Sequence, residues 1–360
     1  MRNNFVVVVL FILVTTFAAV SLASEPTLDL VADIHPTNQI APAWIEAMQV
    51  LDKTPEVIVF ITRNEGAECG GGTPASAWKL TVGSQPDYKA SLSMIQETRG
   101  VIFQGSDGAL FTGGGWCMLK PPYFSQDSGE SWEPADKGIH PYNSTFSYAE
   151  LNGKVYAGTG YNPQPGEVYR WLGASGENNW EKVFVIPYQP RNIVTSMTVY
   201  QEKLFVAASL YEGEPGGVPV YMSIDGNTFE STNGIPGSSS VSHLSVVNDK
   251  LIAFAGNAIY TWNSLISKWE RSSDFPILST GRPKPVVYGR AVYVYGKTTS
   301  DQLPGIYVSL DEGKTWQKFI TVSGPEFSTM TIHGGYLYIG TNADGNKLAH
   351  IYRLNLNAGK

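Results

Sequence analysis

The stretch Ser309-Leu310-Asp311-Glu312-Gly313-Lys314-Thr315-Trp316 decides the fold. It reads Ser-x-Asp-x-Gly-x-Thr-Trp, and each fixed position has a task in a tight turn between two β-strands. The Asp side chain accepts hydrogen bonds from nearby backbone N–H groups, and the Ser adds a local hydrogen bond. The Gly adopts the positive φ that other residues reach only with strain. The Trp covers the hairpin with a large apolar ring.

The same pattern occurs elsewhere in the chain. One full copy runs from Ser125 to Trp132, and a degenerate copy runs from Ser223 to Phe229, with Phe in place of Trp and the Gly one position earlier. The positions that we expect to be structural are Ser125, Asp127, Gly129, Trp132, Ser223, Asp225, Ser309, Asp311, Gly313 and Trp316. These stretches resemble Asp-box (BNR) repeats, which occur in β-propellers of the sialidase-like superfamily. In that family the box is a turn on the face away from the ligand site, so the resemblance implies an architecture and leaves the chemistry open.

A longer repeat supports the same architecture. A short turn followed by a β-rich run recurs along the chain, most clearly at 152–159 and 334–341, with further copies at 99–105, 201–207, 248–254 and 289–295. The steps between copies are about 41–54 residues, the period of a four-stranded propeller blade. The sequence therefore predicts an all-β, seven-bladed β-propeller of four-stranded antiparallel blades, with six or eight blades as alternatives.

The strands of single blades can be placed as well. In the sixth repeat we expect strands at 285–288, 291–296, 305–309 and 316–321, with the box joining the third to the fourth. The third and fifth repeats end in hairpins that resemble kelch repeats instead. The last repeat lacks a fourth strand, and residues 27–32 are predicted to supply it. An N-terminal strand that closes the ring in this way removes a free sheet edge.

The N-terminus and the composition indicate export. Residues 1–23 form a predicted signal peptide, with Arg2, an apolar stretch at 5–20 and small residues before a cleavage site after Ala23. Residues 24–360 are then one propeller domain, expected to be monomeric, secreted or periplasmic, and without a membrane span. The net charge of −7 argues against a nucleic-acid partner. Cys69 and Cys117 are predicted to form a disulfide, and Asn143 begins an N-glycosylation sequon that matters only in a eukaryote.

Catalytic and metal motifs are not found in the sequence. The family that the chain resembles has an arginine in a Phe/Tyr-Arg-Ile-Pro motif and a Tyr–Glu nucleophile pair. That motif is absent, Arg63 falls at the end of a second strand, and no Tyr–Glu pair can be assigned. The five histidines have no metal-ligand spacing, so we expect no metal and no cofactor, and a structural Ca²⁺ is not indicated.

The predicted ligand site is the mouth of the central channel, at the face where the chain enters each inner strand. Residues near the starts of these strands crowd the mouth, and several of them are basic in adjacent blades. Arg suits recognition of carboxylate or phosphate, so we expect an anionic or polyhydroxylated ligand. The candidate residues are Arg191, His243, Arg282 and Lys284, with Glu46 and Glu326 in the opposite sector.

Three functions remain open on the sequence. The first is a non-catalytic exported propeller that binds a glycan or protein ligand at the channel mouth. The second is a sialidase-like glycan-cleaving enzyme. The third is an assembly or scaffold factor for a membrane or surface complex. The missing catalytic motif favours the first and the third, although a fold alone does not decide function.

Overall fold

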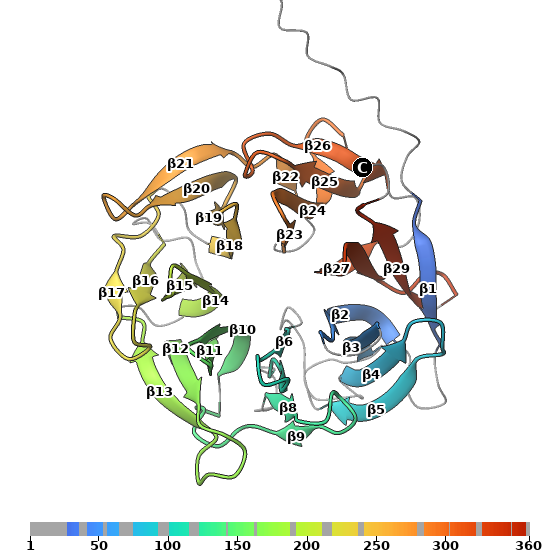
Figure 1. The fold of residues 1–360 in the computed structure, drawn as a ribbon, viewed down its shortest axis with the longest axis horizontal. Coiled ribbons are helices and arrows are strands. Elements are labelled where there is room, and N and C mark those ends of the chain that lie inside the picture. The colour runs from blue at the N-terminus through green and yellow to red at the C-terminus, as the bar shows by residue number, and fades with distance from the viewer. Residues whose placement is uncertain are drawn as a thin grey trace, which may run out of the picture.

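The computed structural model is a ring of seven antiparallel sheets (Figure 1). It describes residues 27–35, 42–52, 56–64, 75–92, 101–114, 122–141, 143–161, 164–187, 192–210, 218–236, 241–278, 284–301, 303–321, 326–346 and 348–357. The predicted seven-bladed propeller is therefore confirmed, and the described residues contain no helix. The predicted signal peptide, Cys69 and Cys117 lie outside the described residues, as do Arg191 and Arg282.

Each blade runs from an inner strand at the ring centre to an outer strand at the rim (Figure 1). The inner strands are β2 (Pro42–Val50), β6 (Ile102–Gln104), β10 (Ser144–Leu151), β14 (Asn192–Tyr200), β18 (Val241–Val247), β23 (Val286–Tyr288) and β27 (Phe327–His333). The second strands are β3 (Val57–Asn64), β7 (Leu110–Thr112), β11 (Lys154–Tyr161), β15 (Lys203–Leu210), β19 (Lys250–Ala255), β24 (Ala291–Thr298) and β28 (Tyr336–Thr341).

The outer half of each blade carries the hairpins that the sequence analysis singled out. The third strands are β4 (Ala75–Thr81), β8 (Tyr123–Ser125), β12 (Gln164–Trp171), β16 (Val220–Ser223), β20 (Ala258–Asn263), β25 (Gly305–Ser309) and β29 (Ala349–Asn355). The outer strands are β5 (Asp87–Leu92), β9 (Glu133–Pro134), β13 (Trp180–Val185), β17 (Glu230–Ser231), β21 (Lys268–Asp274), β26 (Gln317–Thr321) and β1 (Asp29–Ile34).

The ring closes as predicted. β1 pairs antiparallel with β29, so the N-terminal strand is the outer strand of blade 7 (Figure 1). One copy of the recurring run differs from the others. At the other copies the run forms the second strand of its blade, but in the run at 99–105, β6 is the inner strand of blade 2 and β7 is the second. Both are short apolar runs, and the periodicity of such a run does not tell which strand of a blade it forms.

The hydrophobic core lies between the blades. Second strands are covered on both faces by neighbouring blades, which explains their continuous apolar runs; β3 is buried along nearly its whole length. Outer strands have an exposed face and more polar sequences, as in β13. Phe205 of blade 4 packs edge-on against Trp262 of blade 5, with ring centroids 5.7 Å apart. Each blade is thus stabilised by the next.

The three box turns, at 125–132, 223–229 and 309–316, join the third and outer strands of blades 2, 4 and 6. In the last of them, Asp311 Oδ1 accepts hydrogen bonds from Ser309 Oγ and from the Thr315 amide, both at 2.8 Å. Ser309 Oγ also accepts from the Gly313 amide at 2.8 Å. Gly313 has a φ of +87°. The same Ser–Asp, Gly–Ser and Asp–amide bonds recur around Asp127 and Asp225.

Each box turn also packs on the preceding blade. A Cβ added to Gly226 would lie 1.9 Å from the Tyr156 hydroxyl, and one on Gly313 would lie 2.6 Å from Ile259. The aromatic residue faces the same way, since Trp316 contacts the rings of Phe254 and Phe275 of blade 5. The turns therefore stabilise contacts between blades as well as their own hairpins.

Candidate functional site

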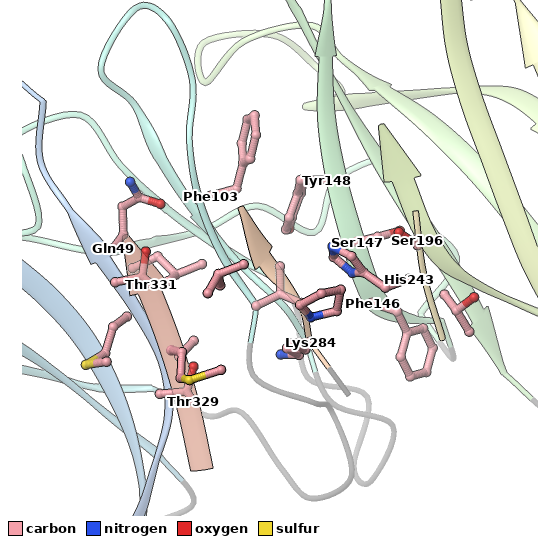
Figure 2. A pocket seen from close by; sticks show the side chains of 18 of the residues that line it. Gln49, Phe103, Phe146, Ser147, Tyr148, Ser196, His243, Lys284, Thr329 and Thr331 are labelled. Carbon is pink, nitrogen blue, oxygen red and sulfur yellow. The ribbon is translucent and has the colours of Figure 1, made fainter. Parts of the chain in front are cut away.

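A cavity of about 270 Å³ lies at the centre of the ring (Figure 2). Its walls come from inner strands and from the residues just before them. Five inner strands shift register at the same height, leaving one residue in a bulge. The bulge residues are Glu46, Phe146, Thr195, Ser242 and Ser328. A bulge re-aims the side chains around it.

The residues directly after the bulges form one layer of the channel wall. They oppose equivalent positions of the second strands, as His243 opposes Phe254 and Ser196 opposes Ala207. Val101 accepts a bond from the Gly113 amide at the same height, and Lys284, two residues before Val286, is level with them in blade 6. This layer, here called the channel ring, consists of Ala47, Val101, Ser147, Ser196, His243, Lys284 and Thr329, all of which line the cavity.

Two pairs of neighbouring blades contribute different chemistry to the channel ring, while Ala47, Val101 and Thr329 complete it. In blades 3 and 4 a small hydroxyl ties one blade to the next: Ser147 Oγ donates to the Val194 carbonyl at 3.0 Å, and Ser196 Oγ accepts from the Leu244 amide at 2.9 Å. In blades 5 and 6 the position carries nitrogen-bearing side chains, His243 and Lys284. In Figure 2 Lys284 lies between the wall that holds His243 and the wall that holds Thr329.

Blade 6 departs furthest from the repeat at this height. β22 (Ile277–Leu278) and β23 both pair with β24, Leu278 opposite Lys297 and Val286 opposite Tyr293. Leu278 and Val286 thus pair with residues four apart on β24, although they are eight positions apart in the sequence. Arg282 falls between them in the sequence but lies outside the described residues.

His243 is neutral at physiological pH. Burial lowers its pKa to about 4, and the positive charge of Lys284 acts in the same direction. The imidazole is partly exposed, but the exposed part faces the cavity. A neutral imidazole offers one donor and one acceptor, so Lys284 and His243 together can bind a negative charge and an adjacent hydroxyl.

Glu46 lies within range of the charges of Lys284 and Arg63. Burial raises the pKa of its carboxyl to about 7, while the charges of Arg63 and Lys284 act to lower it. From the sequence we expect Glu46 in the sector opposite the basic residues. In the structure its carboxyl lies within range of the charge of Lys284. The guanidinium of Arg63 stacks on Trp44, with Cζ 4.3 Å from the ring centroid.

The other predicted site residues do not join this group in the described part of the structure. Glu326 is exposed and does not line the cavity, and its carboxylate accepts from Asn342 Nδ2 at 3.4 Å. Arg191 and Arg282 lie outside the described residues and stay predictions. Sequence reasoning missed the hydroxyls of the channel ring and the Trp44–Arg63 stack. Five of the seven ring residues directly follow a bulge, but the register shifts that make the bulges join residues far apart in the chain, so no local pattern in the sequence marks them.

Asn143 and a Tyr–Glu pair belong to a separate, buried cluster. Glu167 Oε2 accepts from the Tyr169 hydroxyl and from Asn143 Nδ2, both at 2.5 Å, and Glu167 Oε1 accepts from Lys182 Nζ at 3.0 Å. Burial and Glu167 raise the pKa of Tyr169, whereas a nucleophile needs the opposite shift. A glycan on Asn143 requires its Nδ2 at the surface, so this cluster fits a structural role.

No group of three His, Cys, Asp or Glu side chains among the described residues could hold a metal ion. None of the described segments forms a helix long and apolar enough to cross a bilayer.

Comparisons with known proteins carry no argument about function. No protein-family model and no curated protein matches the chain. Among solved structures, the chain is similar to a protein of unknown function from Dyadobacter fermentans DSM 18053, with a TM-score of 0.48 and 11% identity over 91% of this chain and 99% of that one. We base no functional conclusion on that likeness, so the site must be interpreted from its own residues.

Proposed function

We propose that this chain is an exported, non-catalytic propeller that binds a glycan or protein ligand, anionic or polyhydroxylated, at the mouth of its central channel. The box turns support placing it among the Asp-box propellers of the sialidase-like superfamily. The predicted signal peptide supports a secreted or periplasmic location. Arg191 and Arg282 stay predicted members of the same site.

One observation carries the proposal. The channel ring has small or aliphatic residues in five blades, but His243 and Lys284 in the consecutive blades 5 and 6. In blades 3 and 4 this position joins neighbouring blades through a hydroxyl. Two nitrogen-bearing side chains that line a cavity from consecutive blades suit an anionic or hydroxylated ligand, and binding of such a ligand accounts for the break in the repeat there.

The experiment is a glycan array with purified mature protein, repeated with Lys284→Met and His243→Phe. We expect both variants to lose binding while the melting temperature stays within a few degrees of wild type. Lys314→Met is the matched control, because Lys314 is an exposed lysine of the same blade in a box turn. If both channel variants bind the array ligands as wild type does, the channel is not the site.

A second candidate is a glycan-cleaving enzyme. The observation that favours it is Glu46, since a carboxyl with a pKa near 7 can exchange protons at neutral pH. A fluorogenic sialoside assay tests it alongside the array. Turnover that Glu46→Gln abolishes would establish the enzyme. We keep the binding function first because no carboxyl, Glu46 included, is among the described residues that line the cavity.

A further inference from the structure

The bulge position of the inner strands usually supplies a hydrogen-bond donor. Thr195 Oγ1 donates to the Val241 carbonyl of the next blade at 2.6 Å. Ser328 Oγ donates to the Ile45 carbonyl, again of the next blade, at 2.6 Å. Ser242 Oγ donates to the Phe254 carbonyl of its own blade at 3.0 Å. In three blades, therefore, a hydroxyl at this height pairs with a backbone carbonyl beside the channel.

Blade 1 places Glu46 at the same position. An ionised carboxylate only accepts hydrogen bonds, whereas a protonated carboxyl donates one. Only a protonated Glu46 can therefore donate a hydrogen bond at this position, as the hydroxyls do in blades 4, 5 and 7. Glu46 is 8% exposed, and burial of this kind disfavours the charged form.

The charges around Glu46 come from several elements. Arg63 lies on β3, Lys284 precedes β23, and both favour the ionised carboxylate. Glu326 precedes β27 but is exposed and bonded to Asn342. His243 on β18 is neutral. The charge of Lys284 thus acts on Glu46 from the channel side, where a bound anion would also lie.

We propose that the channel takes a small monoanion bearing hydroxyl groups, and that this anion replaces the charge of Glu46 at Lys284, so that Glu46 is neutral in the complex. The inference rests on the proposed function and names its ligand class and its pH dependence. The anion lies against Lys284, and its hydroxyls meet His243 and the serines of the channel ring. Glu46 takes up one proton from solvent when the anion binds above neutral pH.

The expected pH dependence of binding follows from the titration of Glu46 in the ligand-free protein. With the pKa of Glu46 at about 7, the neutral form falls about tenfold between pH 6 and pH 8, and the apparent affinity for the anion falls by the same factor of about ten. Gluconate is the probe, and sorbitol is its uncharged match of similar size. Glu46→Gln keeps a neutral donor at every pH, so its affinity for gluconate stays level over this range.

The experiment is calorimetric titration of the mature protein with gluconate and sorbitol at pH 6 and pH 8, for wild type, Glu46→Gln and Glu326→Gln. Glu46→Thr, which carries the residue of blade 4, replaces Glu46→Gln if the latter does not fold. Carboxyl ¹³C spectra report the titration of Glu46 directly. We expect preference for gluconate, loss of its affinity at pH 8 in wild type and Glu326→Gln, and a level profile in Glu46→Gln.

Three outcomes would overturn the inference: sorbitol binding as well as gluconate, no gluconate binding at either pH, or Glu46 titrating near 4.5 in wild type. Each of these leaves the proposed function standing if Lys284→Met still abolishes binding on the array. Failure of the array experiment itself removes the proposed function, and the inference with it.

Discussion

The box turns at the rim and the channel ring at the centre repeat from blade to blade in different ways. At the rim, three turns make the same Ser–Asp and Asp–amide bonds in blades 2, 4 and 6. At the centre, the pattern of small residues and hydroxyl donors holds in most blades and breaks at His243, Lys284 and Glu46. Where a repeat is kept, stability explains it. Where it is broken by nitrogen-bearing side chains that line the channel, His243 and Lys284, binding explains it.

The largest loss of stability at the rim is expected when the aromatic residue of a box turn is removed. Trp316→Ala should lower the free energy of unfolding by about 3 kcal/mol, the lower end of the range for a core tryptophan, because the indole is only partly buried. The indole packs against Phe254 and Phe275, and its Nε1 donates to the Gly313 carbonyl at 3.0 Å. Urea unfolding measures the loss. Leu310→Ala in the same turn is the control, since Leu310 is 59% exposed. Equal small losses in both variants would mean that the turn does not hold the blades together.

The pH dependence of stability sharpens the channel side of the comparison. The folded pKa of Glu46 is about 7 against 4.5 for the ordinary carboxyl, so folding favours its protonated form. The stability from this group is complete below pH 4.5 and is lost as pH rises through 7, by about 3 kcal/mol. Glu46→Gln lacks that loss. Urea unfolding at pH 4.5 and pH 8 should show the variant gaining about 3 kcal/mol on wild type between the two. Parallel profiles would place the pKa of Glu46 near its ordinary value.

A smaller effect is expected from the acceptor of a box turn. Asp311→Ala should cost about 1–3 kcal/mol, because the Thr315 amide and hydroxyl and the Ser309 hydroxyl lose their shared partner. Hydrogen bonds to the ionised Asp311 lower its pKa, although burial opposes them. Asp274→Ala removes a carboxylate from an exposed ion pair with Arg271 and should change the unfolding midpoint little. Asp311→Ala matching Asp274→Ala would show that the box bonds contribute nothing.

The rim was predictable from the sequence and the channel only in part. The turn at Asp311 needs residues that are adjacent in the chain, so its pattern appears in the sequence. Closure of the ring by β1 followed from a missing strand in the last repeat. His243 and Lys284 were found because they stand near the starts of inner strands. The depth of Glu46 and the hydroxyls of Ser147 and Ser196 depend on register shifts that no local pattern encodes, and on contacts between residues far apart in the chain.

The most direct test of the central claim measures binding and melting temperature together in a channel variant and a rim variant. Lys284→Met and Asp311→Ala are compared with wild type on the array ligands. We predict that Lys284→Met loses binding and keeps its melting temperature within a few degrees, whereas Asp311→Ala melts lower and still binds below its transition. Binding lost in Asp311→Ala and kept in Lys284→Met would contradict the account.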